Sequence, residues 1–477
     1  MASPIQSKFF TPTDLRVIRE AVTGEESRPI FKAAAEAAPD GLKDVIILAP
    51  GTDDIFKSVD ADGLAKDLQE KGVKEVESLE DVGVSARADQ KTLETLAQDG
   101  YLIYDDSPRS LLPGIPRTIR ASGSDRWEMP KIDFVDMTGA DKLQEAGFTG
   151  KGQVVAVIDS GFQHPGHDLL AWKDMVEGST EPLDPVGHGT HVSHDVLQMA
   201  PEAQIVGVRV MGEGGTGRPS DIVRGLQWVT EQRRSGALDI EVINMSLGGA
   251  PDGFPDKLDP INRAVEAATR AGITVVAAAG NSGPDAHTIG APADAKSALA
   301  VGAAFNQTTV SDFSSRGPTD DGLAKPDVMA PGEFISAWSV PGSEMEQTGQ
   351  VVETLRRMSG EQLKELLAEK PQLVEALGLP EDILSRSASE VEELVKPNLP
   401  PVFLPQEGMI AAPGTSFASP IVAGLVADLE QARDASPAEL KEILRETADS
   451  MGSFSPTEQG KGFVNGEKAL QELQRRA

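Results

Sequence analysis

Continuous apolar runs, each followed by a polar or glycine-rich turn, constrain the fold of this 477-residue chain most strongly. A strand that is buried on both faces of a parallel sheet is apolar throughout, whereas a half-buried strand alternates apolar and polar residues. A predicted helix over 220–233 separates two of these runs. The pattern predicts an α/β fold with a mostly parallel sheet. The runs are 153–158, 205–211, 240–245 and 274–279.

Three polar residues stand where such a fold supports chemistry. Asp159 ends the first run, and reacting groups gather at the carboxyl ends of strands in open α/β sheets. His188 begins a predicted helix. Ser416 lies where a loop enters another helix, and the free N–H groups and the helix dipole favour an anion there. Each residue alone is commoner as a turn residue or a cap, but together they indicate nucleophilic catalysis.

The segments around these residues closely resemble those of the subtilisin-like serine proteases, the subtilases. They read DSG at 159–161, GHGTH at 187–191 and GTSFASP at 414–420. The chain order Asp, His, Ser is the order known for subtilisin. The segment TVVAAAGNSG at 274–283 agrees as well. The resemblance covers about 139–470 with one large interruption, and it implies a subtilisin-like, doubly wound, mostly parallel sheet flanked by helices.

The resemblance also implies a role for each catalytic residue. Ser416 would attack a peptide carbonyl, His188 would take and return the proton, and Asp159 would orient the imidazole. Asn281 would donate its side-chain N–H to the oxyanion, and the backbone N–H of Ser416 would be the second donor. An acyl-enzyme would form and then be hydrolysed.

A substrate groove is implied too, in which an extended peptide adds as a strand between two edges of the enzyme. The edges resemble segments 243–249 and 212–217, and the main side-chain pocket is expected between 246–249 and 278–280. A glycine at its floor predicts tolerance of large apolar side chains before the cleaved bond. The expected groove residues are Ser246, Leu247, Gly248, Gly249, Gly214, Gly215, Ala279, Gly280 and Gly290.

Two other motifs compete with this interpretation. Residues 212–217 also fit the G-x-G-x-x-G pattern of dinucleotide sites, but the next predicted strand is not followed by an acidic residue for a ribose. His188, His191 and His194 recur every third residue, yet on a helix the third is rotated about 240° from the first. They therefore cannot hold one metal ion. His191 is expected to be a buried structural residue, and His194 replaces the glycine usual in the family.

Residues 43–112 are predicted to form a separate small domain, because their strands and helices follow the β-α-β-β-α-β order of a ferredoxin-like fold. This α+β domain resembles the inhibitory pro-domain of subtilases; an unrelated α+β domain is the alternative. The tail 105–116 is then expected to occupy the groove and to contain a cleavage site. Residues 1–42 form an N-terminal extension with helical periodicity over 12–38, and 113–138 form a linker.

The interruption, 341–408, divides the expected peptidase domain into 139–340 and 409–477. A capping box at Ser359 opens one helix, and a second helix is expected over 380–395, which together predict a helical hairpin. This insertion is either a decoration packed on the core or a lid and docking site for a regulator, since it leads directly into the nucleophile loop.

Composition restricts partners and cofactors. The net charge of −31 disfavours nucleic acid and anionic membranes as partners. The absence of cysteine excludes disulfides and thiol chemistry. The expected chemistry needs no cofactor; structural calcium is compatible with the acidity, but no contiguous loop supplies a ligand set, so the metal site is unknown. Residues 1–20 lack a basic segment followed by an apolar stretch, which predicts a cytoplasmic protein, with signal-independent secretion as the alternative.

The sequence therefore predicts a serine endopeptidase acting on protein or peptide substrates and made as a precursor that its own N-terminal domain inhibits. The alternative is a catalytically silent scaffold protein that keeps the groove. Intact Asp159, His188, Asn281 and Ser416 favour the enzyme, because a silent relative has no physical need for all four.

Overall fold

The computed structural model describes residues 9–24, 41–51, 59–112, 115–116, 129–164 and 166–476. Its largest unit is an eight-stranded sheet with the order β15-β14-β13-β12-β8-β10-β9, in which β16 also pairs with β14. All pairings are parallel except that of β15 with β14. The strands are β8 (Val154–Asp159), β9 (Ala171–Asp174), β10 (Gln204–Arg209), β12 (Ile240–Met245), β13 (Thr274–Ala278), β14 (Leu299–Asn306), β15 (Thr309–Val310) and β16 (Val328–Pro331).

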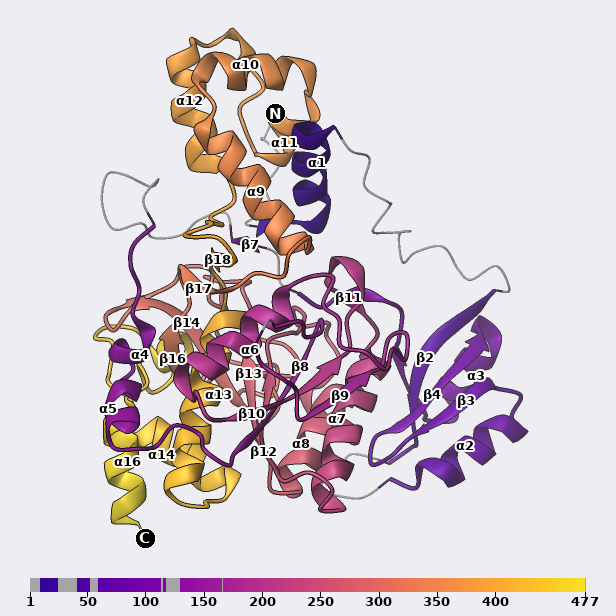
Figure 1. Ribbon diagram of the computed structural model, residues 1–477. Coiled ribbons are helices and arrows are strands. Elements are labelled where there is room, and N and C mark those ends of the chain that lie inside the picture. The colour runs from indigo at the N-terminus through magenta and orange to yellow at the C-terminus, as the bar shows by residue number, and fades with distance from the viewer. Residues whose placement is uncertain are drawn as a thin grey trace.

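Helices cover both faces of this sheet (Figure 1). One face carries α6 (His188–Met199) and α13 (Thr415–Ala432), and the other carries α7 (Pro219–Arg234) and α8 (Pro260–Arg270). The central strand β8 shows why its run must be apolar throughout. Its alternate residues enter two different cores, one with α6 and α13 and one with α7 and α8. The predicted doubly wound subtilisin-like sheet is confirmed.

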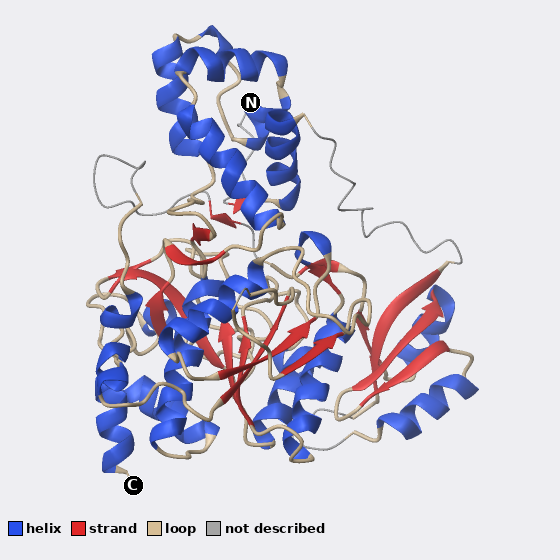
Figure 2. Ribbon diagram, viewed as in Figure 1, coloured by secondary structure: helices blue, strands red, loops and turns tan. Residues whose placement is uncertain are grey.

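A small antiparallel sheet, with the order β3-β4-β2-β5, forms a second unit beside the first (Figure 2). Helices α2 and α3 cover one of its faces, and the other face packs its apolar residues into the core around α7 and α8. The element order and the strand order are those of a ferredoxin-like fold, as predicted. The elements are β2 (Leu42–Leu48), α2 (Ala61–Glu70), β3 (Lys74–Leu79), β4 (Gly83–Asp89), α3 (Gln90–Gln98) and β5 (Leu102–Asp105).

The insertion is a bundle of short helices, so the predicted helical hairpin is wrong. Helix α10 (Gly360–Glu369) does begin after the capping box at Ser359. The predicted helix over 380–395 is broken, however, because Ser387 starts a new capping box with Glu390. The helices are α9 (Glu344–Arg357), α10, α11 (Gln372–Ala376), the 3₁₀ turns η3 (Ile383–Ser385) and η4 (Lys396–Asn398), and α12 (Ala388–Val395).

Two strands flank the insertion in the chain and pair antiparallel at its base. They are β17 (Ile335–Trp338) and β18 (Met409–Ala412). In the N-terminal extension, α1 (Pro12–Thr23) lies against the insertion, beside α9 and α11 (Figure 1). A capping box at Thr11 begins this helix and Gly24 ends it. The rest of the predicted helical stretch, 25–38, lies outside the described residues.

The remaining elements are short or lie at the ends of the chain. They are β1 (Phe9–Phe10), β6 (Arg109–Ser110), β7 (Ile115–Pro116), α4 (Phe134–Met137), α5 (Ala140–Glu145), η1 (Glu213–Gly215), β11 (Thr216–Gly217), η2 (Asp256–Leu258), α14 (Pro437–Thr447), α15 (Pro456–Gln459) and α16 (Gly466–Arg475).

No helix within the residue ranges that the structure describes is both long enough and apolar enough to cross a membrane.

Candidate active site

The carboxyl end of β8 brings Asp159 next to the first residue of α6, His188. Nδ1 of the imidazole lies 2.8 Å from Oδ1 of the carboxylate, and both side chains are buried. Gly189 permits this approach, because a Cβ atom there would lie 2.3 Å from the carbonyl oxygen of Gly161. The predicted acid and base therefore form a contact pair.

The surroundings of His188 favour its protonated form. Burial by itself lowers the pKa of the imidazole, but the adjacent Asp159 carboxylate outweighs this effect and holds the pKa above the ordinary value of 6.5. In the neutral imidazole, Nδ1–H donates to Asp159, which leaves the lone pair of Nε2 available as a base.

A buried carboxyl group that the sequence motifs did not reveal, Asp184, holds the turn before His188. It accepts hydrogen bonds from the hydroxyl of Ser160 at 2.8 Å and from the backbone N–H of Gly187 at 2.9 Å. It also accepts from the N–H and the hydroxyl of Thr190, at 2.8 and 2.7 Å. Burial raises the pKa of Asp184. These bonds tie the end of β8 to the first turn of α6.

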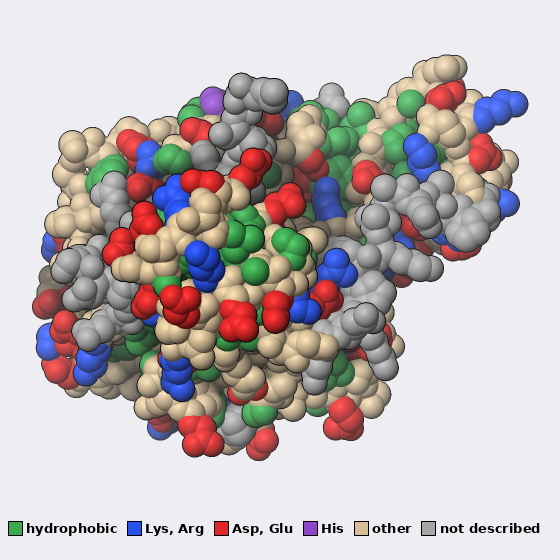
Figure 3. All heavy atoms as spheres, turned by 90° about the horizontal axis from the view of Figure 1, so that it is seen from above, with side chains coloured by type: hydrophobic (Ala, Val, Ile, Leu, Met, Phe, Trp, Pro, Cys, Tyr) green, Lys and Arg blue, Asp and Glu red, His purple; other side chains and the backbone are tan. Residues whose placement is uncertain are grey.

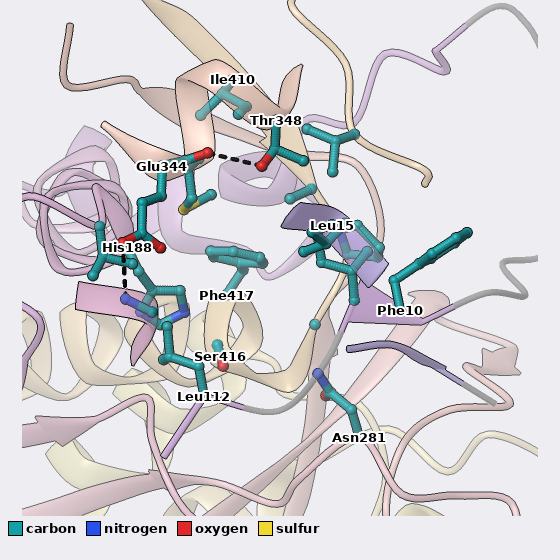
Figure 4. A pocket seen from close by; sticks show the side chains of 18 of the residues that line it. Phe10, Leu15, Leu112, His188, Asn281, Glu344, Thr348, Ile410, Ser416 and Phe417 are labelled. Atoms are coloured by element: carbon teal, nitrogen blue, oxygen red, sulfur yellow. Dashed lines mark hydrogen bonds between the residues drawn. The ribbon is translucent and has the colours of Figure 1, made fainter. Parts of the chain in front are cut away.

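Ser416 lies in the first turn of α13 and faces the same cavity as His188 and Asn281 (Figure 4). Its hydroxyl donates to the carbonyl oxygen of Ser246 at 3.1 Å. The next residue, Phe417, packs its ring against that of His188, with centroids 5.5 Å apart. A rotation about the Cα–Cβ bond of Ser416 would turn the hydroxyl from Ser246 into the cavity.

Ser246, predicted to be part of the groove edge, has a fully buried side chain behind the nucleophile. Its hydroxyl donates to the carbonyl oxygen of Ser416 at 2.6 Å and accepts from the amide of Asn244 at 2.9 Å. Asn244 in turn accepts from the hydroxyl of Ser419 at 2.7 Å. The side chain of Ser246 thus supports the first turn of α13 and does not line the pocket.

Asn281 points its amide nitrogen toward the cavity. Its Oδ1 atom accepts hydrogen bonds from both the backbone N–H and the hydroxyl of Thr415, each at 2.9 Å, and these contacts orient the amide group. Its Nδ2 atom lies near Gly414, where a Cβ atom would be 3.4 Å away. Thr415 is a second functional residue that the sequence motifs contained but that only the contacts identify.

Six of the other predicted groove residues line one narrow cavity beside Ser416. Gly290 marks the meeting point of the pocket walls, since a Cβ atom there would lie 2.6 Å from the carbonyl oxygen of Gly249. A larger side chain at this position must therefore displace the wall at Gly249. The residues that line this narrow cavity together with Ser416 are Leu247, Gly248, Gly249, Ala278, Ala279, Gly280, Gly290 and Ala291.

The chain's own tail lies in the groove. Strand β6 pairs antiparallel with β11. The predicted groove residues Gly214 and Gly215 directly precede β11 in the chain. The N–H of Leu111 donates to the carbonyl of Gly215, and the N–H of Gly248 donates to the carbonyl of Leu111, both at 2.9 Å. Leu111 therefore bridges the two predicted edges, and Leu112 enters the cavity beside Ser416.

The other histidines of α6 do not converge on the site. His191 is fully buried and bonds to Asp195 through Nδ1 at 2.9 Å, as predicted for a structural residue. His194 stacks on His164 with ring centroids 5.4 Å apart, and burial lowers its pKa to about 3. Among the described residues, no group of three or more His, Asp or Glu side chains could hold a metal ion.

Comparison with known proteins identifies the family of the chain. Residues 150–466 match the model of the subtilase family, Peptidase S8. The chain belongs to the subtilase family. It is 34% identical to serine protease AprX of Bacillus subtilis over 346 residues, which cover 68% of this subtilase and 67% of AprX. It is 36% identical over 214 residues to subtilisin DY of Bacillus licheniformis (42% and 72% of the two chains) and 37% identical over 214 residues to subtilisin Savinase of Lederbergia lenta (43% and 72%).

The orientation of Asn281 leads to a prediction. On the expected role of Asn281 as an oxyanion donor, its replacement by alanine should lower kcat roughly 10²–10³-fold, a magnitude that comes from subtilisin itself. KM should change little, because this donor acts mainly in the transition state. Steady-state kinetics on a peptide amide would check this prediction, and an unchanged kcat would show that Asn281 is not an oxyanion donor.

Proposed function

We propose that this subtilase is a serine endopeptidase that cleaves peptide bonds in proteins and is made as a precursor inhibited by its own N-terminal segment. One observation carries the proposal: the Asp159–His188 pair and Ser416 border a groove that holds a strand of the chain itself. The contacts of that strand are those that an extended substrate would make.

The geometry supports the following sequence of events. The hydroxyl of Ser416 turns from Ser246, gives its proton to Nε2 of His188, and attacks the peptide carbonyl. Asp159 stabilises the imidazolium that results. The amide of Asn281 and the N–H of Ser416 receive the oxyanion. His188 then returns the proton to the leaving amine. In the second half of the reaction His188 takes a proton from a water molecule, which attacks the acyl-enzyme, and then gives that proton back to the oxygen of Ser416 as the acyl group leaves.

Contacts outside the groove support the inhibitory role of the small domain. Asp106 accepts from the N–H of Ser220 at 2.8 Å, at the start of α7, where a carboxylate is favoured by the helix dipole. Glu77 and Arg224 form an ion pair at 2.9 Å across the same interface. In the tail, Arg109 lies 3.6 Å from Asp252. The small domain is thus anchored on the enzyme while its tail fills the groove.

Incubation of the purified full chain, followed by N-terminal sequencing, tests this proposal. We expect a new N-terminus within 107–117 and peptidase activity that rises as this species accumulates. The chain with Ser416→Ala should remain intact under the same conditions. Full activity of the uncleaved chain would contradict inhibition, and equal cleavage of the Ser416→Ala chain would show that Ser416 is not the nucleophile.

A further inference from the structure

The insertion shares an apolar core with the N-terminal extension. Ile18 and Ala21 of α1 are buried in this core, and α1 packs against α9 and α11. Seen from above (Figure 3), this part of the surface carries acidic and basic side chains around some apolar ones, whereas the buried apolar residues of the bundle pack with α1. The helices α9, α10, α11 and α12 of the insertion all contribute to this core, among others through Val352, Leu363, Leu373 and Val391.

Other residues of the same N-terminal segment cover the catalytic cavity. Phe10 and Leu15 line the cavity of about 130 Å³ that also contains His188 and Ser416 (Figure 4). Strand β1 pairs antiparallel with β7, so that Phe10 faces Ile115 in the register. Leu112 and Ile115 of the tail both line this cavity, and β1 pairs with the tail at Ile115.

The insertion is bonded to the loops that carry the catalytic groups. The Glu344 carboxylate accepts from the N–H of Gly214 in the groove edge at 2.8 Å. The N–H of Met345 donates to the carbonyl of Val186, two residues before His188, at 3.1 Å. Through these bonds the bundle has a fixed place beside the cavity, and α1, which packs on the bundle, contributes Leu15 to the cavity that contains Ser416.

A polar contact gives the docked helix its register. Nη1 of Arg19 on α1 donates to Oε1 of Gln347 on α9 at 3.0 Å. Glu344 is largely buried next to this contact; burial raises the pKa of its carboxyl group, and the positive charge of Arg19 opposes that effect. The insertion therefore fits an amphipathic helix that carries an apolar face and a neighbouring arginine.

We propose that the insertion is a docking surface for the amphipathic helix α1 and that the N-terminal segment is a bivalent inhibitor. One arm is the small domain with its tail, which occupies the groove up to Leu112. The second arm is β1 with α1, which closes the cavity beyond Ser416. This inference rests on the proposed peptidase function, and it identifies the regulator of the insertion as a segment of the same chain.

Bivalence has a kinetic consequence after the tail is cut. The two arms stay joined through the chain between residues 24 and 41, so release of one arm leaves it at a high effective concentration near its site. Linked modules bind about 10²–10⁴-fold more tightly than either module alone. Activity should therefore appear later than cleavage, with a delay set by dissociation of the N-terminal fragment.

The full chain with Ile18→Asp tests the second arm, because it places a charge in the apolar contact with the insertion. Thr13→Asp is the matched control, since it adds the same charge on an exposed position of the same helix. We expect the interval between tail cleavage and full activity to shorten roughly 10²-fold in Ile18→Asp and to stay unchanged in Thr13→Asp. Equal intervals in all three proteins would overturn the proposal.

Helix α1 also completes the core of the insertion, so a charge at Ile18 affects the stability of the protein as well as docking. A second measurement therefore uses the wild-type enzyme without any substitution. A synthetic peptide of residues 9–24 added to the activated wild-type enzyme should inhibit hydrolysis, and the same peptide with Ile18→Asp should not. Absence of inhibition by the first peptide would overturn the proposal. Labelling of Ser416 by a fluorophosphonate separates the two hypotheses, because an unlabelled enzyme fails as a peptidase, whereas a labelled one that ignores the peptide fails only as the partner of α1.

Discussion

The activated enzyme with Ser416→Ala should hydrolyse a peptide amide roughly 10⁶-fold more slowly than the wild type, a magnitude that comes from subtilisin itself. The substitution removes Oγ, the atom proposed to form the acyl-enzyme, while the cavity and Asn281 remain. The fold should persist, because the lost hydroxyl makes one hydrogen bond, at 3.1 Å to the Ser246 carbonyl. Initial rates on a chromogenic peptide would measure the change.

Activation must be supplied to this variant from outside, since the proposed cleavage of its own tail is lost as well. A trace of wild-type enzyme can cut the tail and then be removed. The binding of a peptide aldehyde analogue is not a suitable control, because it too needs Oγ; binding of a non-covalent product peptide is suitable and should be retained. A loss of activity smaller than tenfold would contradict the role of Ser416 as nucleophile.

Asp159→Asn should lower kcat roughly 10⁴-fold, as the corresponding change does in other serine proteases. An asparagine of the same shape can donate to Nδ1 of His188, which favours the wrong tautomer and places the proton on Nε2. The carboxylate charge that raises the pKa of His188 is lost too, while the burial that lowers it remains. The kinetic and the pH effects therefore have one cause.

The pH profile of kcat/KM tests the second effect. In the wild type the base must be neutral, so activity should be lost as the pH falls through a pKa above 6.5. In Asp159→Asn this acidic limb should move to lower pH. Asp195→Asn is a comparison on the same helix, since Asp195 bonds to His191 and raises the pKa of His188 only through its charge, by less than Asp159 does; it should leave kcat within tenfold of the wild type and move the acidic limb less. An unmoved limb in Asp159→Asn would contradict the pairing.

The parts of the fold that follow from periodicity and motif could be predicted from sequence. An apolar run such as 153–158 is typical of a strand that is buried on both faces. It therefore predicted that Asp159 lies at the carboxyl end of a strand in the sheet, and β8 does end at Asp159. The motifs at 187–191 and 414–420 likewise predicted two helix starts, which the structure places at His188 and Thr415; the second lies earlier than expected, because Pro420 is inside α13 and not in its first turn. Residues that act through their backbone or their lack of a side chain, such as Gly248, were predictable only through the family resemblance.

Other parts could not be predicted, because they depend on contacts between segments far apart in the chain. Asp184 is polar and lies between prolines, which is typical of a surface loop, yet it accepts four hydrogen bonds in the interior. Ser246 looked like a groove residue because its neighbours are, and only its bond to Ser416 shows that it faces the core. Nothing in the N-terminal sequence indicated that α1 would lie on the insertion.

Reaction of the activated enzyme with a fluorophosphonate, followed by mass spectrometry of its peptides, tests the central claim most directly. A serine reacts with this reagent only where a base and an oxyanion site activate it. The geometry predicts a single adduct, located on Ser416 and lost when His188 is replaced by alanine. An activated enzyme that cleaves peptides but carries no adduct on Ser416 would contradict the account.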